Sequence, residues 1–596
     1  MNPKELLRGL SAEQQLAATA PAPLRIIAPA GSGKTLVLAR RLALQLTTGA
    51  ARAHTTAALT FTRAAAHELR RRLARLVEGP LPLTATVHGA ALLWLGELAR
   101  AEGRRPPRVA DTLALLRGLE PGATPALAQA LHRALRVGTS DPRLAQLVER
   151  YRETLRRHHL VDLDDVIDQL ATRLERSEEL REIIGLATLV VDEFQDSTPA
   201  QLRLFRALLG PSLAGLTVVG DPNQAIYGWN GADPAVLDEL RAVNLTTVVL
   251  TRNFRSRDVL VQHAIKVLEE PPAVVGVREG GDPPSARGYA DADSEAVATA
   301  RELRSLHARG VAWRSMAVLG RTHRALEPIA AALRAAAIPH LVVDRGGPIE
   351  VALGQLHSLR DPRTPIKRIL DELWSQPEGD ARVLSQLRRI AVEVARIEPD
   401  ADAEAFREVA MARLATNLDA VTLTTFHRAK GLEWFHVHVV GVGEGAIPHP
   451  RARGTRARSE ERRLLYVALS RATDSLSVSW HQRRPTSWLL PLLGHGATPV
   501  RPQASVAASS PDLARRRVLR ERRALLARAL GLKPELLLPD EVLEVLAHQR
   551  PADAEALQRL LGPALAARNP RAVDELWAAC RAAYERSSSK STTSGA

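Results

Sequence analysis

The sequence predicts an α/β fold with two parallel-sheet domains, helical insertions and a small all-α C-terminal domain. Three observations predict it. In the first half, short apolar runs alternate with helical segments rich in Ala, Leu and Arg, which is typical of a parallel sheet. A second pattern of this kind begins at about residue 246. A separate helical pattern follows a linker-like stretch near residue 500, so we expect several domains in this chain of 596 residues.

The strands and insertions divide the chain as follows. Strands are expected at 24–28, 57–61, 188–192 and 216–220 in the first domain and at 246–250, 315–319, 340–343, 420–424 and 436–442 in the second. The first domain is expected to comprise 1–89 and 186–240 around a helical insertion at 90–185, and the second 241–345 and 417–498 around a smaller one at 346–416. Residues 499–512 have the composition of a linker, 513–583 of a helical domain and 584–596 of a disordered tail.

A glycine-rich loop, APAGSGKT at residues 28–35, joins the first expected strand to a helical pattern. A strand, a tight loop and a helix N-terminus together aim backbone N–H groups at one point, which suits a phosphate. Lys34 would reach the β- and γ-phosphates, and the hydroxyl of Thr35 would bind Mg²⁺. The alternative is an ordinary strand–helix turn. The loop predicts a nucleoside triphosphate site, whose phosphates would be held by Ala30, Gly31, Ser32, Gly33, Lys34 and Thr35.

A second apolar run ends in adjacent carboxylates, Asp192 and Glu193. Because parallel strands present their carboxyl ends to one crevice, this pair can face the same nucleotide as Lys34. Asp192 would lie near Mg²⁺, and Glu193 would orient and deprotonate a water molecule. A solvated acidic turn is the alternative.

Charge and cysteine content limit the partners and the compartment. The chain has 81 Lys and Arg against 66 Asp and Glu, a net charge of +15, which indicates a polyanionic partner. One cysteine allows no disulfide within the monomer and fits a reducing compartment. No apolar run is long enough to span a membrane and no signal peptide is evident, so we expect an intracellular protein without membrane association.

Eight short segments carry polar and aromatic residues along the chain. They are LSAEQ at 10–14, ALTFTRAAA at 58–66, TVHG at 86–89, DEFQDS at 192–197, VGDPNQAIYGW at 219–229, RNFRS at 252–256, TTFHRAKGLE at 424–433 and ERRLLYVALSRA at 461–472. In sequence and order they resemble the motifs of a superfamily 1 helicase of the UvrD/Rep/PcrA type. The resemblance implies two RecA-like domains that bind ATP and Mg²⁺ between them.

The resemblance also implies roles for residues outside the glycine loop. Gln14 would hydrogen-bond adenine, Phe254 would stack on it, and Glu433 would accept from the ribose. Gln224 would sense the γ-phosphate and the attacking water. Arg255 and Arg471 would act as arginine fingers, which in related phosphoryl-transfer enzymes contribute about 10³–10⁵ in rate.

Aromatic residues concentrate in these segments, although only 20 of 596 residues are Phe, Trp or Tyr. Bases stack on aromatic side chains without sequence readout. Phe61, Tyr227 and Trp229, with His88, are therefore candidates for a single-stranded DNA track, whereas core packing is preferred for Phe194, Phe435 and Tyr466. The complete set of expected DNA contacts is Phe61, Arg63, Thr86, His88, Tyr227, Trp229, Thr424 and His427.

Some features depart from the family pattern. Pro29, Leu36, Arg63 and Asn230 stand where relatives usually have Gly, Arg, Asn and Arg, and the first, second and fourth could alter nucleotide affinity or coupling. The interval that would hold the second insertion, termed 2B, is short. Near the C-terminus, residues 539–577 resemble an HRDC domain, a helical module that assists nucleic-acid binding. The arginines at 515–523 predict a basic helix face that contacts phosphates, with an ordinary solvated helix as the alternative.

These observations predict an ATP-dependent 3′→5′ DNA helicase and single-stranded DNA translocase that acts in repair or replication in the bacterial cytoplasm, at the nucleoid. Its partners would be single-stranded DNA, junctions of single- and double-stranded DNA, and repair proteins; the oligomeric state stays open. One alternative is a translocase that displaces proteins, or an ATP-gated DNA-binding or anti-recombination factor, without processive unwinding. Another is the motor of a helicase–nuclease complex, but the residues after 480 offer no acidic cluster for a nuclease.

Overall fold

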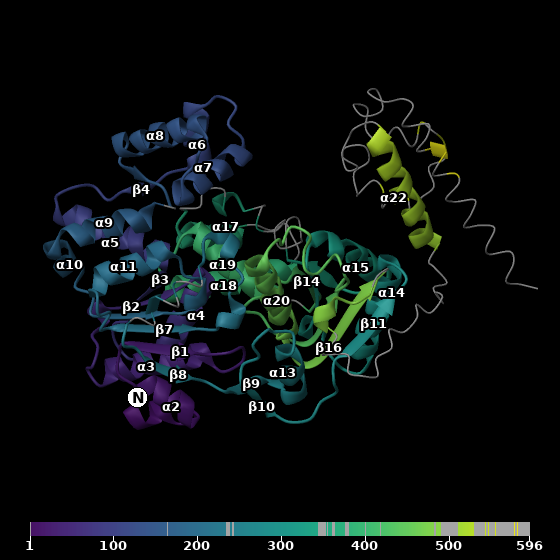
Figure 1. Cartoon of the computed structure of the whole chain (residues 1–596), viewed down its shortest axis with the longest axis horizontal. Helices are drawn as coiled ribbons and strands as arrows, with labels where there is room; N and C mark the ends of the chain where they lie inside the picture. Colours follow the sequence, from purple (N-terminus) through teal and green to yellow (C-terminus); the bar gives the residue numbers. More distant parts are fainter. Residues whose placement is uncertain are drawn as a thin grey trace, which may run out of the picture. The chain divides into compact units, whose positions relative to one another are not determined.

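The computed structural model divides the chain into two compact units, residues 1–287 with 299–499 and residues 288–298 with 500–596, which are described separately (Figure 1). The residues that the structure describes are 2–163, 165–233, 236, 239–240, 243–343, 353, 356–359, 364–375, 381–399, 401–417, 419–481, 484–489, 511–529, 543, 546, 553, 555, 577–578 and 581.

The first sheet has six parallel strands in the order β3-β2-β6-β7-β1-β8. Their bounds are β1 Leu24–Ile27, β2 Thr56–Thr60, β3 Leu83–Thr86, β6 Thr188–Val191, β7 Leu216–Gly220 and β8 Thr246–Val249. Four of the expected strands are found as β1, β2, β6 and β7. The edge strand β3 was not predicted, because Thr84 and Thr86 interrupt its apolar character.

Strand β8 corrects the expected division between the domains. We expected this apolar run to begin the second sheet, but it pairs with β1 in the first, with Leu24 opposite Thr246 and Ile27 opposite Val249. An apolar run indicates that a strand is buried, whereas it carries no information about which strand lies beside it. The first sheet therefore extends beyond residue 240, to Val249.

Helices cover both faces of the first sheet (Figure 1). They are α1 Pro3–Leu7, α2 Ala12–Thr19, α3 Lys34–Thr47, α4 Arg63–Leu73, α5 Val87–Ala101 and α11 Pro199–Leu209. Alternate strand residues enter opposite cores, as the period of a strand requires. In β6, Val190 packs with Leu38 of α3, whereas Leu189 and Val191 pack with Phe205 of α11.

The first insertion is helical, as expected, and has its own core around Leu116, Leu131 and Tyr151. Its helices are α6 Thr112–Leu119, α7 Pro125–Val137, α8 Pro142–Arg157, α9 Val166–Arg176 and α10 Glu178–Ile184. Thr124 and Asp141 cap α7 and α8, each followed by proline in the first turn, which is a favoured helix start. Two-residue strands, β4 Arg108–Val109 and β5 Leu160–Val161, form a parallel pair that was not predicted.

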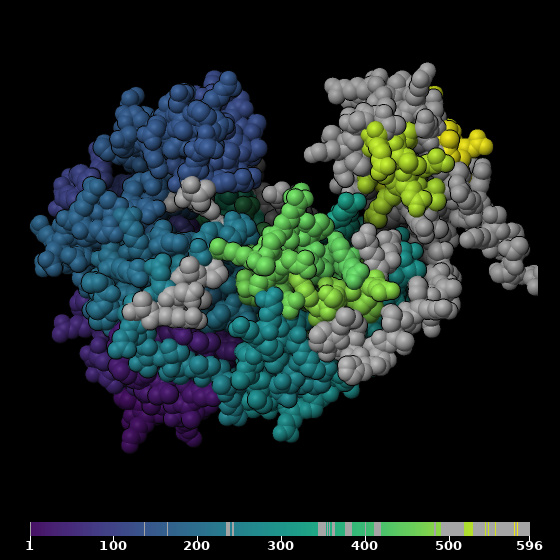
Figure 2. Space-filling view, in the orientation of Figure 1, coloured from purple at the N-terminus to yellow at the C-terminus, as the bar shows by residue number. Residues whose placement is uncertain are grey.

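The second sheet has the order β11-β16-β15-β12-β14-β13. Its strands are β11 Ser285–Tyr289, β12 Met316–Gly320, β13 His340–Val342, β14 Val421–Thr425, β15 Trp434–Val440 and β16 Ala472–His481, with helices α13 Asp258–Ile265, α14 Ala292–Ala308, α15 His323–Ala335 and α20 Thr455–Leu469. The parallel pair β9 Arg252–Arg257 and β10 Val275–Arg278 packs beside α13. Figure 2 shows the teal surface of this region next to the green surface around α20.

The second insertion contains α17 Ile366–Ser375, α18 Ala381–Ile397 and α19 Ala403–Asn417. These helices pack around one core, to which they contribute Ile369, Leu387 and Phe406. In the other unit, helix α22 spans Pro511–Ala529. The expected disordered tail and all but the last two residues of the expected linker lie outside the described residues. None of the described helices combines the length and the apolarity that a membrane span requires.

Candidate nucleotide and DNA site

The glycine loop leaves β1 and enters α3, which begins at Lys34. Gly31 and Gly33 have φ angles of 74° and 84°, in the left-handed region that favours glycine. A Cβ atom on Gly31 would lie 2.6 Å from the Asn253 side chain, so the loop has no room for one. The hydroxyl of Ser32 is buried and makes no hydrogen bond within the protein. The loop therefore has the backbone and an available hydroxyl that a phosphate site requires.

Lys34 lies against the carboxylates that follow β6. Its Nζ is 2.7 Å from Glu193 Oε1, and the Glu193 N–H donates to Asp192 Oδ1 at 2.9 Å. Burial and the charge of Glu193 raise the pKa of Asp192 to about 6. Burial also raises the pKa of Glu193, but Lys34 and Lys430 outweigh it and hold that pKa well below its ordinary value. Glu193 is therefore ionised, as a carboxylate must be in order to accept a proton from water.

Sequence reasoning missed a chain of hydrogen bonds that joins Glu193 to Gln224. Gln195 donates to Glu193 and accepts from the Asp221 N–H at 3.1 Å. Gln224 then donates from Nε2 to Asp221 Oδ2 at 2.7 Å. Gln195 lies in the DEFQDS segment and Asp221 in the VGDPNQ segment. Their membership of these two segments is the sequence signal that could have indicated a role in the site. The predicted base and the predicted γ-phosphate sensor are parts of one buried network.

The segment after β8 contacts the glycine loop directly. Asn253 Nδ2 donates to the Ala30 carbonyl at 2.8 Å, and the Phe254 N–H donates to the Gly31 carbonyl at 2.9 Å. The Tyr466 hydroxyl, on α20, faces the backbone of Ala30. Asn253 and Tyr466 were not among the expected site residues, although both lie within matched segments. The second half of the chain therefore docks onto the phosphate loop.

The two expected arginine fingers lie together, in the second half of the chain. Arg255 is 3.3 Å from Glu433 and donates to the Ser470 carbonyl at 2.9 Å. Arg471 is buried and donates to the carbonyls of Val467 and Leu432. Burial, with the charge of Arg255, lowers the pKa of Arg471 to about 9. In this structure both guanidinium groups form their hydrogen bonds with residues of the second half of the chain. Their contact with phosphate stays a prediction.

The expected adenine-binding residues already have partners. Gln14 accepts from the Ser11 N–H at 3.0 Å and donates to the Ser32 carbonyl at 2.9 Å, so its amide holds helix α2 against the loop. The Phe254 ring is part-exposed, and the Arg252 guanidinium lies 5.5 Å from its centre. Adenine would replace that cation on the ring. The roles of Gln14 and Phe254 toward adenine remain predictions.

Three of the expected DNA-contacting aromatics form a continuous group. The rings of Phe61 and Tyr227 stack at 4.8 Å with an angle of 18°, and Trp229 meets Tyr227 edge-on at 6.1 Å. Trp229 is 70% exposed, which no core residue of its size would be. Because aromatic faces near the surface can take up bases, this geometry suits a stacking track.

For the remaining aromatics, the expected core packing is confirmed at two positions and wrong at the third. Phe194 and Tyr466 are buried, as expected. Phe435 is exposed, so the prediction of a core position was wrong. It precedes His436 on β15, where alternation turns it to the opposite side of the sheet.

Lys430 joins the nucleotide site to these aromatics. Its Nζ donates to Asp196 and to the Gln224 carbonyl, lies 3.6 Å from Glu193 and lies 5.0 Å from the centre of the Tyr227 ring. Burial lowers the pKa of Lys430, but the charges of the nearby carboxylates outweigh burial and raise it. Burial raises the pKa of Asp196 to about 6. The sequence placed this lysine in a matched segment without assigning it a role.

Several expected DNA contacts are engaged within the protein. Thr86 caps α5, accepting from the Gly89 N–H at 3.1 Å, while His88 is half-buried in the first turn. His427 is half-buried, and burial lowers its pKa to about 4. Thr424 is 0% exposed in the middle of β14, because that strand is covered on both faces. The Thr424 hydroxyl makes no hydrogen bond in the protein, and the expected contact of this residue with DNA stays a prediction.

Arg63 has two carboxylate partners from the second insertion. Its Nη1 is 2.9 Å from Asp402 and its Nη2 is 2.9 Å from Glu404. Glu408 accepts from the Ala64 N–H at 3.4 Å, at the N-terminus of the same helix α4. A DNA phosphate would have to compete with these carboxylates for Arg63.

A glycine loop and paired carboxylates on one parallel sheet, docked onto a second sheet, define a P-loop nucleoside triphosphatase with two sheet domains. The sequence matches the UvrD/REP helicase N-terminal domain at 10–115 and 120–242, the UvrD-like helicase C-terminal domain at 248–347 and 379–483, and the HRDC domain at 512–580. The chain belongs to the UvrD-like family of ATP-dependent DNA helicases, which confirms the resemblance drawn from its motifs.

Three relatives illustrate the family. The ATP-dependent DNA helicase UvrD2 of Mycobacterium tuberculosis is 31% identical over 556 residues, covering 80% of this chain and 79% of the relative. The putative ATP-dependent DNA helicase YjcD of Bacillus subtilis is 25% identical, covering 83% and 82%. PcrA of Staphylococcus aureus is 24% identical, covering 80% and 83%. The expected enzyme class, ATP dependence and HRDC domain are thus confirmed.

Proposed function

We propose that this helicase moves 3′→5′ along single-stranded DNA and separates strands at junctions of single- and double-stranded DNA, in bacterial DNA repair or replication. The observation that supports coupling of ATP turnover to movement on DNA is the position of Lys430. It contacts Asp196 and Glu193 at the nucleotide site and the Tyr227 ring at the aromatic group. A change at the carboxylates during ATP turnover would therefore alter the position of the base-stacking residues.

The residues of the first domain would provide the chemistry. The glycine loop and Lys34 would bind the phosphates, and Glu193, held by Gln195, would take a proton from the attacking water. Thr35 and Asp192 offer the hydroxyl and carboxylate oxygens that Mg²⁺ prefers, and the ion would neutralise charge on the transferred phosphoryl group. Because Glu193 already pairs with Lys34, nucleotide entry would separate these two side chains and free the carboxylate for water.

The aromatic group would provide the grip on DNA. Stacking on Trp229, Tyr227 and Phe61 contributes about 1–3 kcal/mol per base and is tolerant of sequence. The basic surplus of the chain would add phosphate contacts, and the HRDC domain would extend them to the second strand at a junction. Direction and unwinding follow from the family resemblance rather than from these contacts, so the experiment has to measure both.

The test compares duplexes that carry a single-stranded 3′ or 5′ extension, each with a fluorophore and quencher at the junction. We expect ATP-dependent separation of the 3′-tailed duplex, little separation of the 5′-tailed one, and none by the matched Glu193→Gln variant. DNA-stimulated ATP turnover without separation of either duplex would replace the helicase with a translocase that displaces proteins. Preference for the 5′ tail would overturn the direction.

A further inference from the structure

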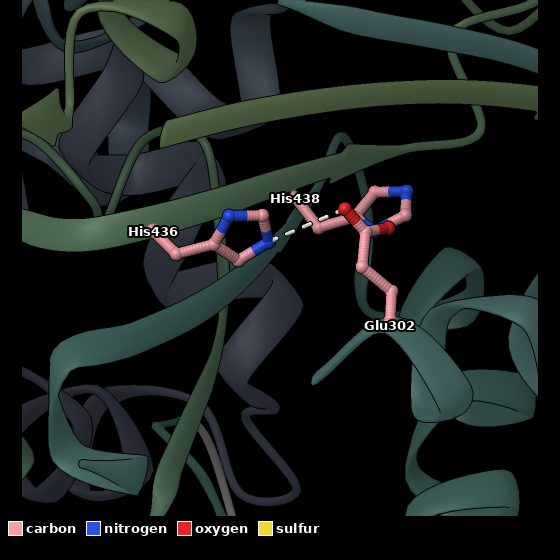
Figure 3. Close-up of side chains that lie close together, drawn as sticks. All are labelled: Glu302, His436 and His438. Carbon is pink, nitrogen blue, oxygen red and sulfur yellow. Dashed lines mark ion pairs between the residues drawn. The ribbon is translucent and has the colours of Figure 1, made fainter. Parts of the chain in front are cut away.

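A polar cluster lies on one face of the second sheet, away from the nucleotide loop. His436 and His438 are two residues apart on β15, so both project from the same face. Glu302, on α14, points toward both rings (Figure 3). His436 is 0% exposed and His438 is buried, whereas the Glu302 side chain reaches solvent in part. A buried pair of imidazoles beside a carboxylate is a costly arrangement unless the groups have matched partners.

Serines on the neighbouring strand β16 orient the two rings. Ser475 Oγ lies 3.0 Å from His436 Nδ1, and Ser479 Oγ lies 2.9 Å from His438 Nε2. The other ring nitrogens, His436 Nε2 and His438 Nδ1, therefore face Glu302. Hydrogen bonds of this kind fix the tautomer of metal-binding histidines and keep the opposite nitrogen free to bind.

The three facing groups lie at separations suited to a shared ion. His436 Nε2 is 3.9 Å from Glu302 Oε1, and His438 Nδ1 is 3.1 Å from Glu302 Oε2. One ligand atom from each residue lies within 4.8 Å of the others. A tetrahedral ion with bonds of about 2.1 Å keeps its ligand atoms about 3.4 Å apart. The observed separations bracket that value, so small side-chain rotations would close the site.

Both nitrogens that face Glu302 are buried and make no hydrogen bond in the protein. His436 Nε2 is too far from Glu302 for one, whereas His438 Nδ1 has only its close approach of 3.1 Å to that carboxylate. An unsatisfied buried nitrogen costs free energy that a metal–nitrogen bond would recover.

Serine hydroxyls also hold the carboxylate of the cluster. Ser477 donates to Glu302, and Ser285 donates to Ser477 at 2.8 Å, which holds the carboxylate in place.

We propose that Glu302, His436 and His438 bind one Zn²⁺ ion, which clips the helix segment of Glu302 onto strand β15. Two imidazoles and one carboxylate are a donor set that zinc takes in proteins, with water in the fourth position. The part-exposed side of Glu302 gives water access to that position. The site lies apart from the carboxylates proposed to hold Mg²⁺, so the ion would take no part in ATP hydrolysis.

The test is metal binding by the full-length protein, in a Cys580→Ser background so that the single thiol takes up no metal. After treatment with a chelator, Zn²⁺ is titrated in competition with a chromophoric chelator, and Co²⁺ is added separately to record visible absorption. We expect one Zn²⁺ per chain, the intense Co²⁺ bands of a four-coordinate site, and a higher melting temperature with Zn²⁺.

Variants assign the ion to the cluster. Glu302→Gln keeps the size of the side chain and His438→Gln keeps most of it, and each should weaken Zn²⁺ binding at least tenfold and abolish the Co²⁺ bands. His54→Gln, at a histidine outside the cluster, is the matched control and should bind as the parent does. Circular dichroism without metal identifies any variant that fails to fold, and the other variant then decides.

Two results would overturn the proposal. The first is a parent protein without stoichiometric Zn²⁺ binding at micromolar concentration. The second is unchanged affinity in both folded cluster variants, which would move the ion elsewhere. In either case Glu302 and His438 would form an ion pair and nothing more. Neither result bears on strand separation, so the proposed helicase mechanism is tested independently.

Discussion

Replacing Lys430 by Met removes the cation that links the nucleotide site to the aromatic group, while keeping the length of the side chain. The Asp196 side chain is completely buried, so it would lose its ion-pair partner. Leaving one member of a buried pair unpaired typically costs about 3–5 kcal/mol. That range assumes that the remaining group stays charged.

Asp196 has a less costly alternative, because its pKa is already raised to about 6. At pH 7, protonating it costs about 1.4 kcal/mol, since each pKa unit corresponds to about 1.36 kcal/mol. The lost hydrogen bond from Lys430 to the Gln224 carbonyl adds about 1 kcal/mol. We therefore expect Lys430→Met to reduce the free energy of unfolding by about 2–3 kcal/mol at pH 7.

The pH dependence of this loss has a definite sign. Below pH 6 Asp196 is protonated in the folded protein and the lysine matters less, so the loss should shrink to about 1 kcal/mol. Above pH 6 the loss of unfolding free energy should grow by about 1.4 kcal/mol per pH unit. This growth should end at the pH where Asp196 of the variant is more stable as an unpaired carboxylate than in its protonated form. Differential scanning calorimetry at pH 5.5, 7 and 8 measures it, with the exposed Lys266→Met as the control.

The stimulation of ATP turnover by DNA should be affected more strongly than the free energy of unfolding. We expect Lys430→Met to bind nucleotide but to lose at least tenfold in the stimulation of ATP turnover by single-stranded DNA. Adding Asp196→Asn should restore most of the stability at pH 8 and none of the stimulation. A stability loss that is the same at all three pH values, or full stimulation by DNA in the variant, would refute the reasoning.

Three further predictions follow from the site. Lys34→Ala should abolish phosphate release from ATP while largely preserving affinity for single-stranded DNA; continued hydrolysis would contradict the loop assignment. Trp229→Ala should weaken the binding of a fluorescent oligonucleotide by about 5- to 150-fold, which corresponds to the 1–3 kcal/mol of one stacked base; unchanged affinity would place the DNA elsewhere. Combining Asp402→Asn with Glu404→Gln should free Arg63 and raise DNA affinity up to about thirtyfold, since each of the two exposed ion pairs is worth about 0.2–1 kcal/mol. The salt dependence of binding should steepen by about 0.7 for the added phosphate contact, and unaltered values would exclude Arg63 from the DNA surface.

The sequence predicted the elements whose signal is local. The loop at Lys34 and the carboxylates at Asp192 and Glu193 were found because glycine, lysine and acidic residues at fixed offsets have few other uses. Strand β8 was placed in the wrong sheet because its apolar pattern is the same whichever strand pairs with it. Lys430 received no role because its importance depends on Asp196, 234 residues away in the sequence.

Partners distant in the sequence also explain the other differences. Arg63 was expected to meet DNA, and nothing near it in the sequence indicates its carboxylate partners Asp402 and Glu404. Thr424 lies in an expected strand, but burial on both faces depends on helices contributed by other segments. The cluster at His436 and His438 was hidden because two histidines alternating with valine are read as an ordinary strand.

The assignment of β8 to the first sheet has a mechanical consequence. Strand β8 ends at Val249 and β9 begins at Arg252, so only Leu250 and Thr251 separate the first sheet from the segment that docks onto the glycine loop. Glu13 accepts from the N–H and hydroxyl of Thr251, which anchors the short connection to the base of α2. The connection is therefore a two-residue hinge beside the glycine loop, because the next residues of β9 already contact that loop through Phe254 and Gly31. Any movement of Arg255 relative to the first sheet would have to bend the chain at Leu250 and Thr251, so a motion of the second sheet would begin at the edge of the proposed phosphate site.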